Sequence, residues 1–255
     1  MRHQRTTDAA GSPGHDDGAA VEFAHLHPPC PVTCQRAFRH IACRRVHPAV
    51  DTSCTRPYCM ANLQGTTRAR MNRPTRIEPL PESEWTDEQR QMAAPLEAQY
   101  GLVFNVLKTL MRHMPLLKSW NPLAGYLMTG SSLSPRHREL LIMRVAWQTG
   151  SDYEWGQHVL MSQAAGLSEQ DHRRIKAGPD DPGWPAIERA LLKAADELLD
   201  EQYVSEPTWE SLAEQLTDVQ RMDAIFTVGQ YAMLAMALKT LGVEREPGVP
   251  GFDGG

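Results

Sequence analysis

The chain has 255 residues and a formal net charge of −5 at pH 7, enough length for one large domain or two small ones. The charge is unevenly divided: residues 1–70 hold 9 Lys+Arg and 5 Asp+Glu, a balance of +4, while residues 71–255 hold 17 and 26, a balance of −9. Because nucleic-acid binding needs clustered cations, the acidic main part argues against a nucleic-acid partner.

Residues 1–70 differ in composition from the rest of the chain. They are rich in Arg, His, Pro, Gly, Thr and Cys and show no sustained hydrophobic periodicity, so we expect a disordered extension. All five cysteines lie between Cys30 and Cys59, but no CxxC pair occurs, which makes a zinc site the weaker alternative. Met71 also resembles a natural translation start, in which case residues 1–70 come from a misplaced start. We therefore divide the chain into residues 1–70 and a helical domain, residues 71–255.

The domain opens with three predicted helices. A capping residue and a following glycine predict a first helix from Thr86 to about Tyr100, kinked at Pro95. Apolar spacing predicts two more helices, Val103–His113 and Leu116–Met128. Their aromatic residues, such as Trp120, are expected to pack in the core or line a pocket.

The centre of the domain, Leu133–Gly166, is predicted to form two helices joined by a tight turn. Ser134 suits the N-cap of the first helix, and Gly150 suits the left-handed residue that ends it. Ser151 or Asp152 can cap the second helix.

Four further helices and a tail complete the predicted order. The helices run from about Ser168 to Lys176, Ala186 to about Glu201, Glu206–Leu216 and Asp218–Leu241. We expect Asp196 and Glu197 to be solvated, although Asp196 could pair locally, and the Pro/Gly-rich tail from Glu244 onward to be mobile. With no alternating segment long enough for a strand, the sequence predicts an all-α class: a single helical domain of about eight helices.

The sequence gives no sign of a membrane or secretory protein. No apolar run approaches the ~20 residues of a membrane span. The longest candidate, Ala224–Leu238, is interrupted by polar residues and is typical of a core helix. The N-terminus has no apolar signal-type segment. We therefore expect a cytoplasmic protein without a membrane partner.

Three polar residues lie where apolar ones would be expected on the two central helices. Glu139 shares a helical stripe with Ile142 and Ala146, and Glu154 lies four residues before His158 on one face of the next helix. A carboxylate on an apolar stripe is costly unless it is paired. Two carboxylates and an imidazole converging on an apolar seam indicate groups whose pKa values are shifted toward proton transfer.

The spacing of these residues resembles the carboxymuconolactone decarboxylase family, which shares its helical fold with the alkylhydroperoxidase D proteins. The peroxidase branch has a Glu, eleven residues, a Cys, two residues, a Cys, three residues and a His. In this chain the same spacing runs Glu139, Ser151, Glu154 and His158. The Glu and the His match, and both cysteines are replaced. The resemblance covers roughly Met71–Phe252.

The resemblance implies an enzyme that decarboxylates a small carboxylated lactone or related acid in aromatic compound catabolism, without a metal or an organic cofactor. Glu139, Glu154 and His158 would be the catalytic residues that handle protons. The resemblance also implies a homo-oligomer, with the central helix pair near a subunit contact. The expected partners are therefore a small-molecule substrate and further copies of the chain.

Other residues near this cluster are candidates for substrate binding. Tyr153 and Gln157 flank it, and Arg144 and Arg136 could receive a substrate carboxylate.

Two other functions stay open. The first is a peroxidase of the alkylhydroperoxidase D type, a peroxiredoxin-like activity suggested by the family label although serine and glutamate cannot replace its thiols. The second is a non-catalytic helical oligomer that binds a small molecule. His158 can also be a core histidine, and Glu139 a structural acid bonded to Arg144 or to a helix N-terminus. Convergence of the three side chains on a pocket would favour the enzyme.

Overall fold

The computed structural model describes residues 74–253, which lie within one compact unit, Leu63–Gly255. Within the described range the regular structure is helical, which confirms the predicted all-α class. The predictions for residues 1–70, including the zinc alternative and the boundary at Met71, lie outside the described residues. The α-helices are α1 (Asp87–Tyr100), α2 (Asn105–Leu110), α3 (Met114–Gly125), α4 (Pro135–Thr149), α5 (Asp152–Ala164), α6 (Glu169–Ala177), α7 (Ala186–Asp200), α8 (Glu206–Ala213) and α9 (Asp218–Leu241).

Local capping chemistry sets most helix ends, as predicted. Thr86 and Gln89 form a reciprocal capping box at the start of α1, and Ser134 accepts a hydrogen bond from the His137 amide at the start of α4. Gly150 ends α4 with φ +66°, a conformation that glycine adopts without steric cost. Ser151 stands at the N-cap of α5 without a capping hydrogen bond from its side chain.

The second and third predicted helices differ from the observed ones. Only Asn105–Leu110 is α-helical, and Met111–His113 tightens into a 3₁₀ turn. The His113 side chain accepts from the Leu116 amide and so caps α3, which starts earlier than predicted. After Gly125 the chain loosens into a π-type turn, Tyr126–Gly130.

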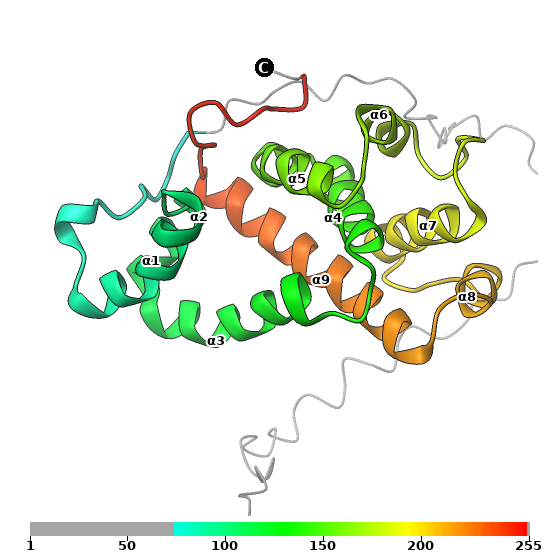
Figure 1. The fold of residues 1–255 in the computed structure, drawn as a ribbon, viewed down its shortest axis with the longest axis horizontal. Helices are drawn as coiled ribbons and strands as arrows, with labels where there is room; N and C mark the ends of the chain where they lie inside the picture. Colours follow the sequence, from blue (N-terminus) through cyan, green and yellow to red (C-terminus); the bar gives the residue numbers. More distant parts are fainter. Residues whose placement is uncertain (1–73, 254–255) are drawn as a thin grey trace, which may run out of the picture. The chain divides into compact units, whose positions relative to one another are not determined.

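Helix α4 is the centre of the main core. It packs against α5, α6, α7 and α9, and α9 runs diagonally behind it across the domain (Figure 1). The α4 side chains from Glu139 to Ala146 are all buried. A smaller apolar cluster joins the N-terminal helices around Trp85 and Met111. Because α4 is enclosed on several sides, any polar residue on it must find its partner inside the protein.

The tail after Glu244 packs against α5, so the prediction of a mobile tail is wrong. The Glu246 carboxylate accepts hydrogen bonds from the Asn105 amide at 2.6 Å and from the Tyr153 hydroxyl at 2.8 Å. A Cβ added at Gly156 of α5 would meet the Pro250 carbonyl oxygen at 2.3 Å, so the tail needs a glycine at this point on the helix.

A second set of contacts holds the end of the tail. Asp152 accepts from the Phe252 amide at 2.9 Å and pairs with Arg245 at 2.8 Å. The Phe252 ring lies 5.3 Å from that of Trp147 and 5.7 Å from that of Trp155. We call residues 244–253 the C-terminal strap. It fixes the start of α5, the helix that carries Glu154 and His158.

Among the described helices, α9 is long and apolar enough to cross a membrane by length and composition alone. Ala224, Val228, Ala235 and Leu238 on its inner side are buried in the protein, as in the core helix of a soluble domain. The helix therefore gives only weak evidence for a membrane span.

A chain that begins at Met71 is expected to keep the helical signal and the melting temperature of the full chain. The first described residues already bind the domain, because the Arg76 and Ile77 amides donate to the Leu241 carbonyl at 2.8 and 3.2 Å. Circular dichroism and thermal melting of the two chains test this. A large loss of stability on removing residues 1–70 would contradict it and favour the zinc alternative.

Candidate functional site

The centre of the candidate site is a buried hydrogen bond between α4 and α5. His158 Nδ1 lies 2.7 Å from Glu139 Oε2, and the exposed fractions of the two residues are 6% and 1%. Arg138 adds a positive charge, with its Nε 3.5 Å from the other carboxylate oxygen. The structure therefore joins two of the three predicted catalytic residues directly.

The surroundings of Glu139 favour its ionised form. Burial alone would raise its pKa, but the charge of His158, the hydrogen bond to it and the charge of Arg138 bring the pKa below its ordinary value. An ionised carboxylate only accepts hydrogen bonds, so Nδ1 of His158 must carry the hydrogen. This leaves Nε2 as the ring nitrogen available for proton exchange.

Glu154 is a different kind of acid. It is 2% exposed, and neither carboxyl oxygen has a well-formed hydrogen bond to any described residue, although the Ser151 hydroxyl is nearby. Burial raises the pKa of Glu154 to about 8, against the smaller opposing effects of Ser151 and of the Lys239 ammonium. A carboxyl group with this pKa is largely protonated at neutral pH and can donate a proton.

Tyr231 of α9 lies close enough to both carboxyl groups to feel their charges. Its ring meets the His158 ring edge-on, with centroids 5.1 Å apart. Burial, followed by the charges of Glu139 and Glu154, raises the pKa of the Tyr231 hydroxyl. We call Glu139, Glu154, His158, Tyr231 and Arg138 the acid cluster.

A cavity lies on the other side of Tyr231, between α3 and α9. It has a volume of about 190 Å³. Its lining residues are Trp120, Asn121, Ala124, Gly125, Met128, Gln230, Tyr231 and Leu234. None of Glu139, Glu154 and His158 lines it, so the convergence on a pocket that would favour the enzyme is not seen at this cavity. Tyr231 therefore lines the cavity and also contacts His158 of the acid cluster.

Tyr153 and Gln157 bind the C-terminal strap. The Tyr153 hydroxyl donates to Glu246 at 2.8 Å and accepts from the Val106 amide at 3.2 Å. The Gln157 side-chain amide also donates to Glu246. Substrate binding by these two residues stays a prediction, and a substrate would have to replace these internal bonds.

Arg144 is buried in an ion pair that joins α4 to α7. Its Nε and one terminal nitrogen each lie 2.7 Å from an oxygen of Asp196, and the other terminal nitrogen donates to the Ile175 carbonyl. Asp196, expected from the sequence to be solvated, is therefore paired with Arg144. Glu197, for which the same was expected, accepts a hydrogen bond from the Ser205 hydroxyl. Arg144 as a substrate ligand stays a prediction, although its guanidinium is already bound.

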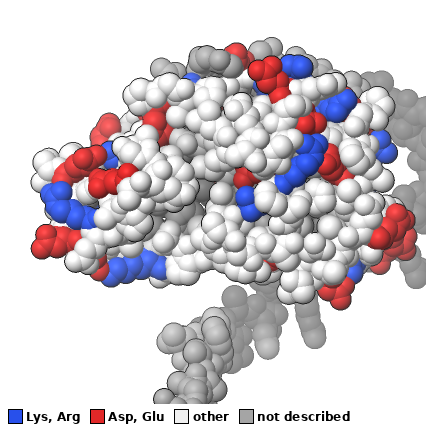
Figure 2. Space-filling model, in the orientation of Figure 1, with Lys and Arg blue, Asp and Glu red and all other residues white. Residues whose placement is uncertain are grey.

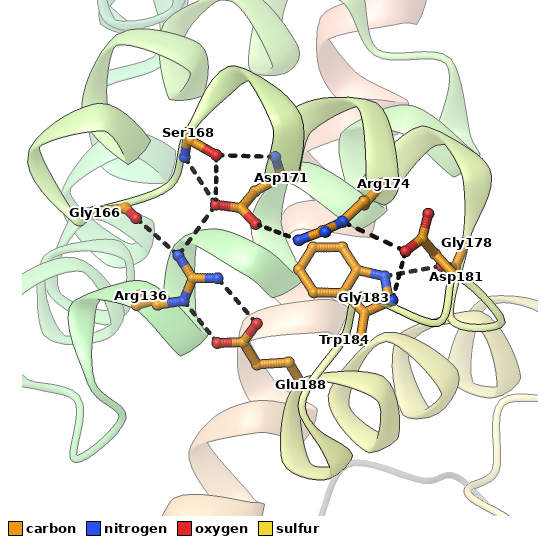
Figure 3. A network of polar contacts seen from close by, with 10 residues as sticks. All are labelled: Arg136, Gly166, Ser168, Asp171, Arg174, Gly178, Asp181, Gly183, Trp184 and Glu188. Carbon is orange, nitrogen blue, oxygen red and sulfur yellow. Dashed lines mark hydrogen bonds and ion pairs between the residues drawn. The ribbon is translucent and has the colours of Figure 1, made fainter.

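Arg136 is the centre of a separate polar network (Figure 3). It donates to both oxygens of Glu188, at 2.6 and 3.0 Å, and to the Gly166 carbonyl at 2.7 Å. Asp171, which caps α6, approaches the same guanidinium at 3.3 Å. These contacts join α4, α6 and α7 and leave Arg136 occupied.

Sequence reasoning missed three polar residues near the site: Tyr231, Gln230 and Arg138. The signal for the first two was present, because they interrupt the apolar run Ala224–Leu238 of α9. Arg138 had no such signal beyond its place next to Glu139. Among residues 74–253 no group of three His, Cys, Asp or Glu side chains is arranged to hold a metal ion.

The helical fold that positions the buried Glu–His pair is similar to that of solved alkylhydroperoxidase D-like proteins. A peroxidase-related protein from Ralstonia eutropha JMP134, described as an alkylhydroperoxidase AhpD core, is 20% identical over 68% of this chain and 94% of its own, with a TM-score of 0.61. One from Silicibacter sp. TM1040 is 18% identical over 72% and 97%, with a TM-score of 0.62. The debrominase Bmp8, solved with 2,3,4-tribromopyrrole, is 12% identical over 68% and 93%, with a TM-score of 0.59. At these identities the likeness shows the fold.

Sequence comparison finds one family match. Residues 115–197 match the model of the carboxymuconolactone decarboxylase family, in agreement with the resemblance in the spacing of Glu139 and His158. No curated protein matches the chain significantly.

Proposed function

We propose that the protein is a cofactor-free enzyme that decarboxylates a small carboxylated lactone or a related acid, with the acid cluster handling the protons. The observation that supports this most is Glu154, a buried acid without a well-formed hydrogen bond and with a pKa of about 8, one helical turn from the Glu139–His158 pair. Such an acid has no evident structural task and is costly to bury.

In the proposed reaction the bond between the substrate carboxylate and the ring carbon breaks. Carbon dioxide leaves, and the electron pair stays on the ring as an enolate. Glu154 gives its proton to the enolate carbon, and the Glu154 carboxylate left behind regains a proton from water, relayed by Nε2 of His158 while Glu139 holds Nδ1. The Arg138 guanidinium, close to Glu139, is placed to stabilise negative charge that develops beside the cluster.

A turnover screen tests the proposal. The purified chain is incubated with a panel of five- and six-membered lactone acids, and released carbon dioxide is measured beside the Glu154→Gln variant. We expect release that depends on Glu154. No release by the folded protein from any member of the panel would contradict the proposal. It would favour the alternative of a small-molecule binding protein, which the position of Tyr231 between cavity and cluster also favours.

Thiol-dependent hydroperoxide turnover is expected to be absent. That chemistry needs a thiolate and a second thiol that resolves the sulfenic acid, and residues 71–255 contain no cysteine. The measurement is hydroperoxide consumption with a dithiol reductant. Activity that disappears when Cys54 and Cys59 are changed to Ser would contradict this prediction and assign the activity to residues 1–70.

We also propose that the chain forms a homo-oligomer in the cytoplasm. One side of α9 bears a row of large apolar side chains at helical spacing, each at least half exposed: Val219, Met222, Phe226, Met233 and Met236. A patch of this kind marks an interaction surface, and the resemblance suggests a second copy as its partner. Phe226→Asp is expected to shift the sedimentation coefficient to that of a monomer, and a wild-type chain that already sediments as a monomer would contradict the proposal.

A further inference from the structure

The cavity between α3 and α9 is uncharged and of a size for one ring. No Lys, Arg, His, Asp or Glu is among its lining residues. The surface over α3 and the adjoining part of α9 also shows few charges (Figure 2). Its volume of about 190 Å³ is somewhat larger than the roughly 150 Å³ of an apolar cavity known to bind benzene. A compact ring of six or seven heavy atoms fits that space.

The shape of the lining favours a planar molecule. Trp120 supplies an indole ring, and Ala124 and Gly125 leave space on the same side because their side chains are small or absent. Aromatic side chains bind flat rings through offset stacking or edge contacts. Met128 is flexible and adapts to an irregular outline.

Gln230 supplies the polar recognition. It is 5% exposed, it lines the cavity, and both its amide nitrogen and its amide oxygen lack a hydrogen-bond partner among residues 74–253. A buried amide left in this state costs about 1–3 kcal/mol for each unsatisfied group. Both atoms are inaccessible in the free protein, so a ligand in the cavity would pair with them once the side chain turns toward it, and this pairing would remove the cost. Because an amide donates through nitrogen and accepts through oxygen, its complement carries one acceptor and one donor side by side.

We infer that this cavity binds a small planar ring with an uncharged edge at which a carbonyl stands next to an N–H or O–H group, with the Gln230 amide pairing with both. The statement that the bound ring is also a substrate rests on the proposed function. Among the acids proposed as substrates, it selects those whose ring carries a carbonyl next to an N–H or O–H group. It also places that ring beside Tyr231, which lines the cavity and contacts His158 of the acid cluster.

A pair of simple probes tests the inference by binding alone. 2-Pyridone has the ring carbonyl and the adjacent N–H, whereas N-methyl-2-pyridone keeps the ring and the carbonyl but lacks the donor. Titration of the full chain, followed by ligand-observed NMR, gives both affinities. We expect 2-pyridone to bind at least ~10-fold more tightly, because the second probe leaves the Gln230 oxygen unpaired. Equal affinities, or no binding of either probe, would overturn the inference.

The Gln230→Met variant tests whether the Gln230 amide is the group that distinguishes the two probes. Methionine has a similar length and leaves no polar atom unpaired, so the preference for 2-pyridone should fall to within ~2-fold and the melting temperature should not decrease. Gln163→Leu, an exposed position on α5, is the matched control and should keep the preference. A preference that survives in Gln230→Met would overturn the inference, and the comparison of the two probes on the wild-type chain decides it even if that variant does not fold.

Failure of this inference and failure of the proposed function are distinguishable. The Glu139→Gln variant changes a residue that does not line the cavity, so it should bind 2-pyridone as the wild-type chain does. Binding with the expected preference but no decarboxylation of any acid would reject the proposed reaction and keep the binding site. Glu154-dependent decarboxylation without a preference between the probes would reject the binding site alone.

Discussion

Replacing Glu139 by Gln is expected to lower turnover by roughly 10²–10⁴-fold, the usual contribution of a general acid or base. Glutamine keeps a hydrogen-bond acceptor 2.7 Å from His158 Nδ1 but removes the negative charge that stabilises the protonated ring. His158→Gln should have an effect of the same size. The measurements are kcat/KM on a confirmed substrate and the melting temperature of each variant.

The double variant and a control separate catalysis from folding. Glu139→Gln with His158→Gln should lose little more turnover than the worse single variant, since residues that act as a unit are not additive. Glu197→Gln removes a carboxylate that binds Ser205 and Thr208 outside the cluster, so it should affect stability and leave kcat/KM unchanged. If His158→Gln keeps full activity, or only unfolds the protein, His158 is a core histidine.

Glu154 is expected to make stability decrease as pH rises from about 4.5 to about 8, and to make activity decrease as pH rises through about 8. Its pKa is about 8 in the folded state and near its ordinary value, 4.5, when unfolded. Below the lower value the group is neutral in both states and carries no penalty. Between the two values unfolding releases a proton, so the free energy of unfolding falls with rising pH, by on the order of 3–5 kcal/mol in total. The acid needed for proton donation is lost as pH rises through about 8, the upper end of this range.

Denaturant unfolding between pH 4 and pH 9 measures this dependence, together with kcat/KM over the same range. Glu154→Gln should be more stable than the wild-type chain at pH 9 and should lose most of the slope. Glu210→Gln, at an exposed position on α8, is the matched control and should keep the slope. A wild-type profile that is flat between pH 5 and 9 would contradict the raised pKa.

Much of the fold could be predicted from the sequence, because most helix ends depend on local chemistry. Thr86, Ser134 and Thr217 each accept a hydrogen bond within their own first turn, and Gly150 ends α4 by its own backbone freedom. The tail was predicted incorrectly because its partners are distant in sequence: Glu246 binds Tyr153, 93 residues earlier. Periodicity shows which side of a helix is buried but does not identify its partner.

The candidate site divides in the same way. The pairing of Glu139 with His158 followed from spacing within two adjacent helices, and the burial of Glu154 from its apolar face. Tyr231 and Gln230 come from α9, more than seventy residues later, and only the packing of α9 against α4 brings them near. Asp196 looked solvated because its amphipathic helix gave no sign of Arg144 on α4.

The C-terminal strap has a consequence for how the protein is made. During synthesis a chain leaves the ribosome from its N-terminus, and helices α4 and α5 emerge about a hundred residues before Glu246. Until residues 244–253 appear, Tyr153 and Gln157 lack their shared carboxylate, and Asp152 lacks Arg245. The helix that carries Glu154 and His158 is therefore completed by residues translated long after it, so a chain interrupted before Arg245 has its core but an unfinished site.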